Sequence, residues 1–190
     1  MAEMPKSPRF PPSSASRAAR RGSARVIEVL AYPSVQLLDV TGPLQVFATA
    51  NEQVVEAGGT PPYALRVVAK DRVRVVASSG LEIATEPLPR GASALDTLVV
   101  AGGPGVDLAA SDPALLDWLR QRVKKARRVA SVCTGAFLLG ASGALDGRRA
   151  VTHWSYCAAL AKRFHCMREI LHGNQRHVFQ RAGGGFCEHA

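Results

Sequence analysis

One cysteine stands where two apolar segments of different kinds meet. Residues 128–132 are typical of a short strand and residues 134–142 of an apolar helix, so Cys133 lies at the joint. The amides and dipole of a helix N-terminus favour an anion, and thiolate is the nucleophilic form of cysteine. Thr134 is small and Gly135 allows a tight turn, which keeps the sulfur approachable. Position alone leaves open both a reactive cysteine and an inert, buried one.

Two further polar residues follow strand-like segments. Asp39 precedes Thr41-Gly42-Pro43, and it either caps a helix or aims its carboxyl at the sulfur from a neighbouring strand end. His153 follows Cys133 by twenty positions and ends another short strand. A lone histidine is usually structural, but beside a thiol it is a candidate general base.

A glycine-rich loop follows the apolar segment 95–101. Gly102, Gly103 and Gly105 offer backbone amides that no side chain obstructs, and such a nest can hold an oxyanion or ligand beside the sulfur. A plain turn is the alternative. The loop matches neither the phosphate-binding Walker pattern nor the dinucleotide-binding glycine pattern, so we expect no cofactor.

The C-terminal stretch is rich in potential metal ligands but lacks a zinc spacing. We expect no metal site there. The residues concerned are His165, Cys166, His172, His177, Cys187 and His189.

Strand-like and helix-like segments alternate along the body of the chain. We expect strands at 25–31, 63–70, 95–101 and 128–132, a short strand that follows a turn at Gly147 and runs through Thr152, and a hairpin from 73–76 and 81–84. We expect helices from Gly42-Pro43 to about 56, from Pro113 (capped by Asp112) to about 126, at 134–142 and at 154–164. This order predicts an α/β fold whose mostly parallel sheet is covered on both faces. Ligands bind such sheets at the carboxyl ends of strands, where the three loops described above lie.

The positive charge is concentrated at the two ends of the chain. The formal net charge of the 190 residues is +9, of which residues 1–24 carry +4 and residues 162–190 carry +3, leaving +2 on the body. A basic groove on the folded domain is therefore not indicated. Residues 1–24, rich in Pro, Ser and Arg, are expected to be a disordered basic tail; a transit peptide is the alternative.

The remaining composition favours a cytoplasmic protein. No apolar segment is long enough to span a membrane, and no secretory signal is evident, so we expect no membrane association. The four cysteines form no CxxC pair, which favours reduced thiols.

Three motifs resemble the ThiJ/PfpI family of the class I glutamine-amidotransferase-like superfamily. They are Tyr32-Pro33 with Leu38 to Phe47, Val99 to Gly105, and Val129 to Leu139 continuing to Thr152-His153-Trp154. The resemblance covers residues 25–164 as one domain. It implies a flavodoxin-like three-layer sandwich, Cys133 on a nucleophile elbow, glycine amides near the sulfur, an acidic partner at Asp39, and a homodimer.

Two branches of that family are similar to this chain. In isonitrile hydratases the matching residues, here Asp39, Cys133 and Thr134, serve catalysis. In AraC-type transcriptional regulators the domain precedes a helix-turn-helix module. The sequence from Cys133 to Trp154 resembles these regulators more than the hydratases. We therefore expect a domain that senses a small-molecule ligand and reaches DNA only through a helix-turn-helix domain missing from this chain. A cysteine-dependent hydratase or amide hydrolase is the alternative.

The stretch 165–190 departs from the family pattern. It shows no further strands, closing helix or helix-turn-helix, so we expect an atypical tail and incomplete C-terminal elements, as in a truncated or frame-altered product. A third reading is accordingly a protein without activity. If the carboxyl of Asp39 activates the sulfur, an Asp39→Asn substitution should slow thiol labelling.

Overall fold

The computed structural model describes residues 24–70, 73–91, 95–164, 167–168 and 180–181. The strands are β1 (Arg25–Leu30), β2 (Tyr63–Ala69), β3 (Arg74–Val76), β4 (Glu82–Ala84), β5 (Glu86–Pro87), β6 (Leu95–Val100), β7 (Ala126–Ser131), β8 (Arg149–Ala150), β9 (Met167–Arg168) and β10 (Gln180–Arg181). The helices are α1 (Leu37–Glu56), α2 (Val106–Ala110), α3 (Pro113–Lys125), α4 (Gly135–Ala141) and α5 (Cys157–Arg163), with a 3₁₀ turn at Trp154–Tyr156. The predicted tail at 1–24 lies, up to residue 23, outside the described residues.

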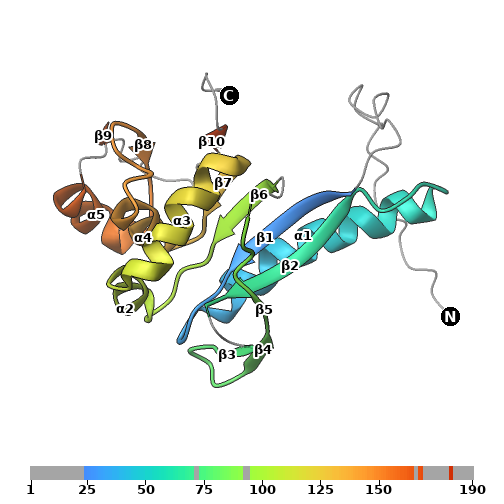
Figure 1. Ribbon diagram of the computed structural model, residues 1–190, viewed down its shortest axis with the longest axis horizontal. Helices are drawn as coiled ribbons and strands as arrows, with labels where there is room; N and C mark the ends of the chain where they lie inside the picture. Colours follow the sequence, from blue (N-terminus) through green and yellow to red (C-terminus); the bar gives the residue numbers. More distant parts are fainter. Residues whose placement is uncertain (1–23, 71–72, 92–94, 165–166, 169–179, 182–190) are drawn as a thin grey trace, which may run out of the picture.

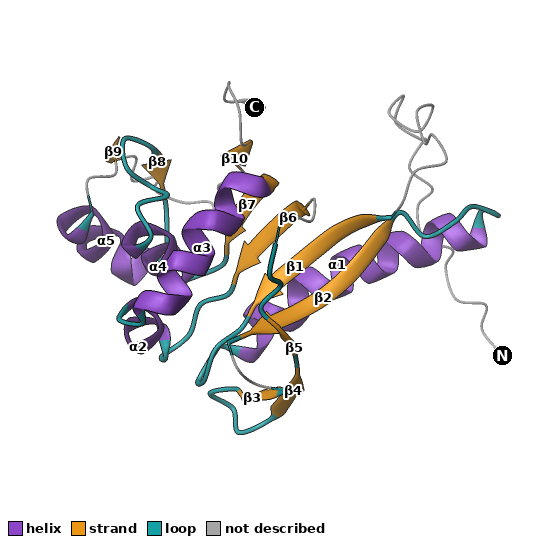
Figure 2. Ribbon diagram, viewed as in Figure 1, coloured by secondary structure: helices purple, strands orange, loops and turns teal. Residues whose placement is uncertain are grey.

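A mostly parallel sheet forms the centre of the molecule (Figure 2). Its strands follow the order β10-β7-β6-β1-β2-β5, and all neighbours pair in parallel except β10 with β7. The long strands thus run in the order that defines a flavodoxin-like sheet. The predicted α/β, flavodoxin-like class is confirmed.

Helices cover both faces of this sheet (Figure 1). The connection from β1 to β2 runs toward one edge of the sheet and that from β6 to β7 toward the other. Because such crossovers are right-handed, α1 and α3 must lie on opposite faces. The two connections thus leave in opposite directions from the neighbouring strands β1 and β6, so the loops after these strands flank a crevice at the carboxyl ends.

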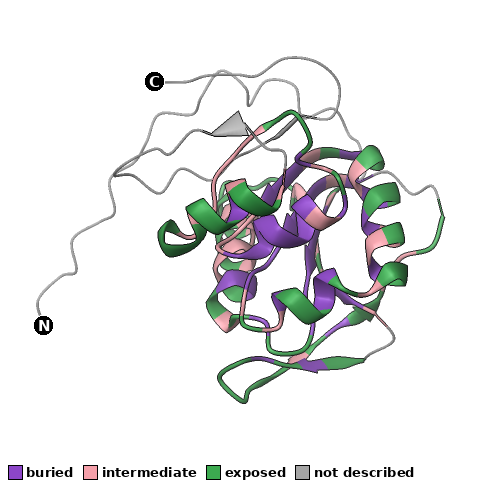
Figure 3. Cartoon of the chain, turned by 90° about the vertical axis from the view of Figure 1, so that its left-hand side faces the viewer, coloured by how far each residue is buried: buried purple, intermediate pink, exposed green. Residues whose placement is uncertain are grey.

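The buried core is mostly aliphatic and includes most residues of β1 and β6. Figure 3 shows the buried residues gathered in the interior of the molecule. Val29, Leu30, Leu98 and Val100 are fully buried, as continuous apolar runs predict for parallel strands covered on both faces. None of the helices in the described residues is long and apolar enough to cross a bilayer.

Local signals identified several elements correctly. β3 and β4 form the predicted antiparallel hairpin. Asp112 caps α3 by accepting hydrogen bonds from the amides of Ala114 and Leu115, and Pro113 is the first helical residue. The short helix α2, whose residues are Val106-Asp107-Leu108-Ala109-Ala110, was not predicted.

The prediction for the first helix was wrong at its start. We expected α1 to open at Gly42-Pro43, but it begins at Leu37 and contains Pro43 within it. Proline has no N–H to donate to the helical hydrogen bond and is therefore disfavoured inside a helix, so we expected Pro43 to lie in the first turn. As a result Asp39 lies in the first turn of a helix, not in a loop after a strand.

Candidate functional site around Cys133

Cys133 adopts a backbone conformation that few non-glycine residues take. It lies between β7 and α4 with φ of 52°, in the left-handed region. The carbonyl of Cys133 accepts a hydrogen bond from the Thr152 hydroxyl at 2.8 Å. The amide of Val132, just before it, donates to the Val100 carbonyl at 2.9 Å. The strand end and the segment after β8 therefore hold this turn from both sides.

Gly135 allows the turn to lie against β6. A Cβ at this position would lie 2.2 Å from the carbonyl oxygen of Val100 and 2.8 Å from that of Ala101. No side chain fits at such distances. The close approach of α4 to the sheet therefore requires the glycine at position 135.

Asp39 reaches the glycine loop from the first turn of α1. Its side chain is buried, and Oδ2 accepts a hydrogen bond from the Gly102 amide at 3.0 Å. The Gln36 amide at the start of α1 donates to the Gly102 carbonyl at 2.8 Å. Helix α1 and the loop after β6 are therefore joined at one residue.

The loop amides expected to hold an oxyanion bind groups of the protein. The Gly103 amide donates to Thr134 Oγ1 at 2.9 Å, and the Gly105 amide donates to the Ser34 carbonyl at 3.2 Å. With Gly102 bound to Asp39, all three amides have partners within the chain. Their direct contact with a ligand stays a prediction.

Gly102 is the point where the parts of the site converge. A Cβ built there would lie 2.9 Å from Asp39 Oδ2, 2.6 Å from the Thr134 amide nitrogen and 2.8 Å from Thr134 Oγ1. The carboxylate and the residue after the cysteine thus approach the same small volume. The structure brings together Asp39, Cys133, Thr134 and the glycine loop.

His153 lies beside this group, not within it. Its Nδ1 accepts a hydrogen bond from the Ser155 amide at 3.3 Å, and its ring contacts those of Trp154 and Tyr156. Within the described part of the chain, the imidazole makes no hydrogen bond to the Cys133 sulfur. Its role as a general base stays a prediction.

Burial and charge favour the thiol form of Cys133. Partial burial raises the pKa of the thiol, and the nearby Asp39 carboxylate raises it further; hydrogen bonds from the amide and hydroxyl of Thr134 lower it. The net shift in pKa is upward. Burial and the adjacent carboxylate therefore oppose the stabilisation of a thiolate that a helix N-terminus favours, and a thiolate at Cys133 stays a prediction.

Tyr32 belongs to the same electrostatic group, although sequence reasoning gave it no role. Its buried hydroxyl donates to the Ala101 carbonyl at 2.9 Å. Burial raises the pKa of this phenol, and the Asp39 carboxylate and, once it is ionised, the Cys133 sulfur raise it further. A tyrosine directly after a buried strand, near Asp39 in sequence, was the available signal.

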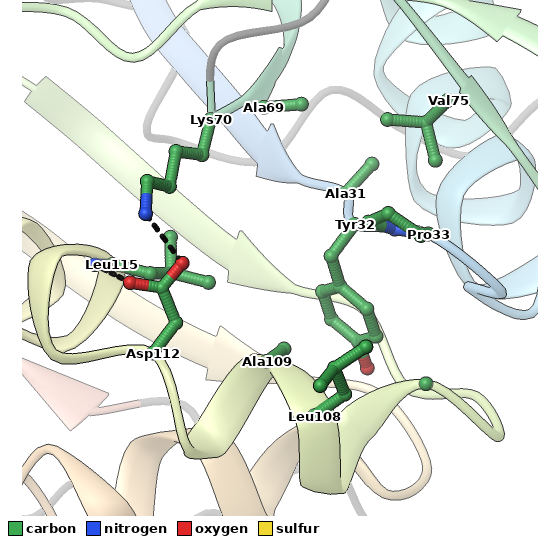
Figure 4. Close-up of a pocket in the computed structure, with 11 residues that line it drawn as sticks. Ala31, Tyr32, Pro33, Ala69, Lys70, Val75, Leu108, Ala109, Asp112 and Leu115 are labelled. Carbon is green, nitrogen blue, oxygen red and sulfur yellow. Dashed lines mark hydrogen bonds and ion pairs between the residues drawn. The ribbon is translucent and has the colours of Figure 1, made fainter.

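A cavity of about 280 Å³ lies at the carboxyl ends of β1 and β2 (Figure 4). Tyr32 contributes to its wall, while Cys133 does not line it. Lys70 and Asp112 form an ion pair at this cavity, with 2.6 Å between Nζ and Oδ2. The cavity and the cysteine are therefore separate places that share Tyr32.

The structure offers no candidate metal centre in the part of the chain that it describes. No group of three or more His, Cys, Asp or Glu side chains is placed there to hold an ion. The histidines and cysteines of the C-terminal stretch lie outside the described residues. The absence of a metal site stays a prediction.

Curated relatives of this chain include both regulators and an enzyme. An uncharacterised protein from Streptomyces lividans is 42% identical over 142 residues, which span 75% of this chain and 96% of that protein. Isonitrile hydratase from Pseudomonas putida is 40% identical over 130 residues, 68% of this chain and 53% of the enzyme. The HTH-type transcriptional regulator GbdR from Pseudomonas aeruginosa is 28% identical over 160 residues, 83% of this chain but 42% of the regulator. The chain thus spans about half the length of the enzyme and the regulator.

Solved structures share the fold. A THiJ/PfpI family protein from Pseudomonas syringae superposes with a TM-score of 0.67 at 29% identity, over 92% of this chain and 69% of that one. An AraC family transcriptional regulator from Pseudomonas putida gives a TM-score of 0.61 at 24% identity, over 84% of each chain. Residues 24–171 match the DJ-1/PfpI family. On this match and the extent of the related sequences, the chain belongs to the DJ-1/PfpI family.

Proposed function

We propose that this chain is the ligand-sensing domain of an AraC-type transcriptional regulator. Its small-molecule site comprises Cys133, Asp39, Thr134 and the glycine loop at 102–105, and DNA is read by a separate helix-turn-helix domain. Support comes from the similarity to GbdR along 83% of this chain and from the shared fold of an AraC family regulator.

The observation that carries the proposal is a cysteine in a left-handed turn, whose thiol pKa is raised by burial and by Asp39. Its left-handed backbone costs on the order of 1–3 kcal/mol, and such strain clusters at functional sites. Yet the pKa of the thiol is raised, and the amides of Gly102 and Gly103 already bind Asp39 and Thr134. Such an arrangement suits recognition of a ligand better than nucleophilic attack at neutral pH.

The alternative is a cysteine-dependent hydratase or amide hydrolase. The 40% identity to isonitrile hydratase favours it. In this reading Cys133 is the nucleophile, Asp39 and Thr134 handle protons and orient the substrate, and His153 supplies a further base. The thiol proton must then leave for a base before attack, because the raised pKa leaves little thiolate near neutral pH.

Thermal stability in the presence of candidate ligands tests the sensing proposal. We expect a subset of a panel of small metabolites, isonitriles and amides to raise the melting temperature of the wild-type chain, since a ligand that binds only the folded state stabilises it. Asp39→Asn should abolish this rise. Asp117→Asn is the matched control, because Asp117 is exposed on α3 and pairs with Arg120.

Turnover of the same panel separates the two functions. The sensing proposal expects no product from any isonitrile or amide. Product formation by the wild type that Cys133→Ser abolishes, and that Cys157→Ser retains, would establish the enzyme instead. Stabilisation that persists in both Asp39→Asn and Cys133→Ser would place the ligand elsewhere.

A further inference from the structure

We propose that the cavity beside Tyr32 binds a small molecule with a carboxylate-like anionic head and an apolar body. The cavity lies where β1 and β2 end, which is where α/β sheets bind ligands. The role of this ligand as an effector rests on the proposed sensing function. The binding itself does not depend on Cys133.

The floor of the cavity is apolar and well packed. Ala31, Ala69, Val75 and Leu115 line it, and each is at most 3% exposed. These side chains come from the ends of β1 and β2, from β3 and from α3, so the floor is held by four elements. A hydrocarbon body placed against them loses contact with water, which favours binding.

The charged end of the cavity holds hydrogen-bond donors that an anion can accept from. Asp112 is already engaged: Oδ1 accepts from the amides of Ala114 and Leu115, and Oδ2 pairs with Lys70. The Lys70 ammonium has three N–H donors and uses one on Asp112, with its side chain 36% exposed. Asp112 thus fixes the ammonium at the cavity (Figure 4), and the remaining donors suit a carboxylate.

The dimensions favour a short ligand. At about 280 Å³ the cavity is near the lower limit of small-molecule pockets, which start at roughly 300 Å³. Leu108 lines the cavity, yet its side chain is 75% exposed, so it offers apolar surface that a ligand would cover. An aliphatic chain of a few carbons ending in a carboxylate fits these limits.

The cavity is separate from the cysteine site but adjoins it. The Tyr32 side chain lines the cavity, and its hydroxyl binds the Ala101 carbonyl next to the glycine loop. The Asp39 carboxylate and, once it is ionised, the Cys133 sulfur raise the pKa of that hydroxyl. A ligand against Tyr32 would therefore touch a residue that belongs to both places.

The test titrates the full chain with acetate, butanoate and hexanoate, and with butylamine and hexylamine, at fixed ionic strength by calorimetry. We expect affinity to rise from acetate to hexanoate, and hexylamine to bind about tenfold more weakly than hexanoate, because the amine cannot accept a hydrogen bond from Lys70. Equal binding of amine and carboxylate, or no measurable carboxylate binding, would overturn the proposal.

Variants locate the bound hexanoate. Lys70→Met should weaken it about tenfold, whereas Lys124→Met removes the same charge from an exposed position on α3 and should change nothing. Leu108→Asp should weaken it by repulsion, and Leu81→Asp, exposed outside the cavity, should not. If Lys70→Met and Leu108→Asp both bind as the wild type does, the proposal is wrong.

Cys133→Ser separates this inference from the proposed function. Hexanoate should bind Cys133→Ser as it binds the wild type, even if no metabolite is ever found at the cysteine. Loss of hexanoate binding in that variant would place the carboxylate at the cysteine and reject the cavity.

Discussion

Gly102 shows how an absent side chain shapes the candidate site. Asp39 Oδ2 and the amide nitrogen of Thr134 occupy the space that a Cβ would need, at 2.9 and 2.6 Å. Asp39 Oδ2 accepts a hydrogen bond from the Gly102 amide, and Thr134 Oγ1 accepts one from the Gly103 amide, so these two residues connect α1, the loop after β6 and the start of α4. One methyl group here must displace at least one of them.

We therefore expect Gly102→Ala to lower the free energy of unfolding by about 1–3 kcal/mol, the cost of overpacking. Gly42→Ala is the control, because Gly42 lies inside α1 and its Cβ would meet only Leu38 Cδ1, at 4.0 Å. There the helix propensity of alanine should raise stability by about 0.5–1 kcal/mol. Urea unfolding measures both, and two effects of the same sign would contradict the assignment.

Asp39 should restrain the reactivity of Cys133. Its negative charge raises the pKa of the thiol, so Asp39→Asn should lower that pKa and speed alkylation near neutral pH. This is the reverse of the effect expected from sequence, where the carboxyl was assumed to activate the sulfur. Iodoacetamide labelling followed at the Cys133 peptide by mass spectrometry, from neutral to alkaline pH, measures it.

Asp117→Asn removes the same charge from an exposed position and is the control for that experiment. A slower rate in Asp39→Asn than in the control would mean that the carboxyl activates the sulfur after all. Equal rates would remove Asp39 from the electrostatics of the site.

Residues that touch along the chain were predictable, and residues that meet across the sheet were not. Cys133 and its neighbours carry their signal in one short motif. Tyr32, Lys70 and Thr152 gain their roles only when strand order brings separate loops together. A single sequence does not specify that order, so their contacts could not be anticipated.

At the scale of elements, capping and turn signals were reliable because they are local. Asp112-Pro113 marks the start of α3, since a carboxylate accepts the free amides of a first turn. The start of α1 carries no such local signal, because the side chain of Gln36 does not cap the helix. Pro43 lies inside the helix but is a residue type typical of a first turn, so the start was predicted too late. Tertiary contacts from the glycine loop, not local signals, define the start of that helix.

An ion network fastens β6 to β7 and should make stability depend on acid pH. The Asp96 side chain is 9% exposed and pairs with Arg127 and Arg128. Burial raises its pKa, but hydrogen bonds from Arg127, Thr97 and Arg128 outweigh this and lower the pKa from 3.8 to about 2. Because the folded pKa is the lower one, the carboxylate stabilises the fold above pH 3.8, and this contribution is lost as pH falls toward about 2.

Asp96→Asn should therefore cost about 1 kcal/mol at neutral pH, less than the pKa shift alone implies because solvent screens the two arginines. The difference from wild type should shrink as the pH approaches 2, where wild-type Asp96 is increasingly protonated. Urea unfolding at several pH values measures this. A difference that stays constant down to that pH would contradict it. Asp117→Asn, on an exposed pair, should show little effect throughout.

A buried ion pair links the central strand to a covering helix. Arg122 of α3 donates from Nε to Glu28 Oε2 at 2.7 Å and from a terminal nitrogen to Oε1 at 2.5 Å, and both residues are almost fully buried. Glu28→Gln leaves a buried guanidinium without its counter-charge, so we expect a loss of about 3–5 kcal/mol. The double variant Glu28→Leu/Arg122→Met should lose clearly less. Chemical unfolding measures the series, and equal losses would show that packing, not charge, dominates.

At the scale of the whole molecule, the alternation of apolar strands with helices predicted the α/β fold class. That fold class in turn predicted the edge of the sheet at which the candidate site lies. Parallel strands have all their carboxyl ends at one edge, so loops far apart in sequence must meet there. What alternation could not specify was the wall between the cysteine and the cavity. That wall is Tyr32, which lies directly after β1 and lines the cavity together with Leu108 and Ala109 of α2.

The distribution of charge gives the last prediction. Of the net +9, residues 1–24 carry +4, while residues 25–161 carry only +2 with acids and bases interspersed. Non-specific DNA binding by this chain should therefore come mainly from its ends.

We expect the triple variant Arg17→Gln/Arg20→Gln/Arg21→Gln to bind random duplex DNA more weakly. The slope of log K against log salt concentration should become shallower by up to about 3, since each phosphate contact contributes about 0.9. The control Arg66→Gln/Arg90→Gln/Arg120→Gln removes the same charge from the folded body and should change the slope by less than about 1. Fluorescence anisotropy across a salt series measures both, and a steeper loss in the control would place the binding surface on the sheet domain instead.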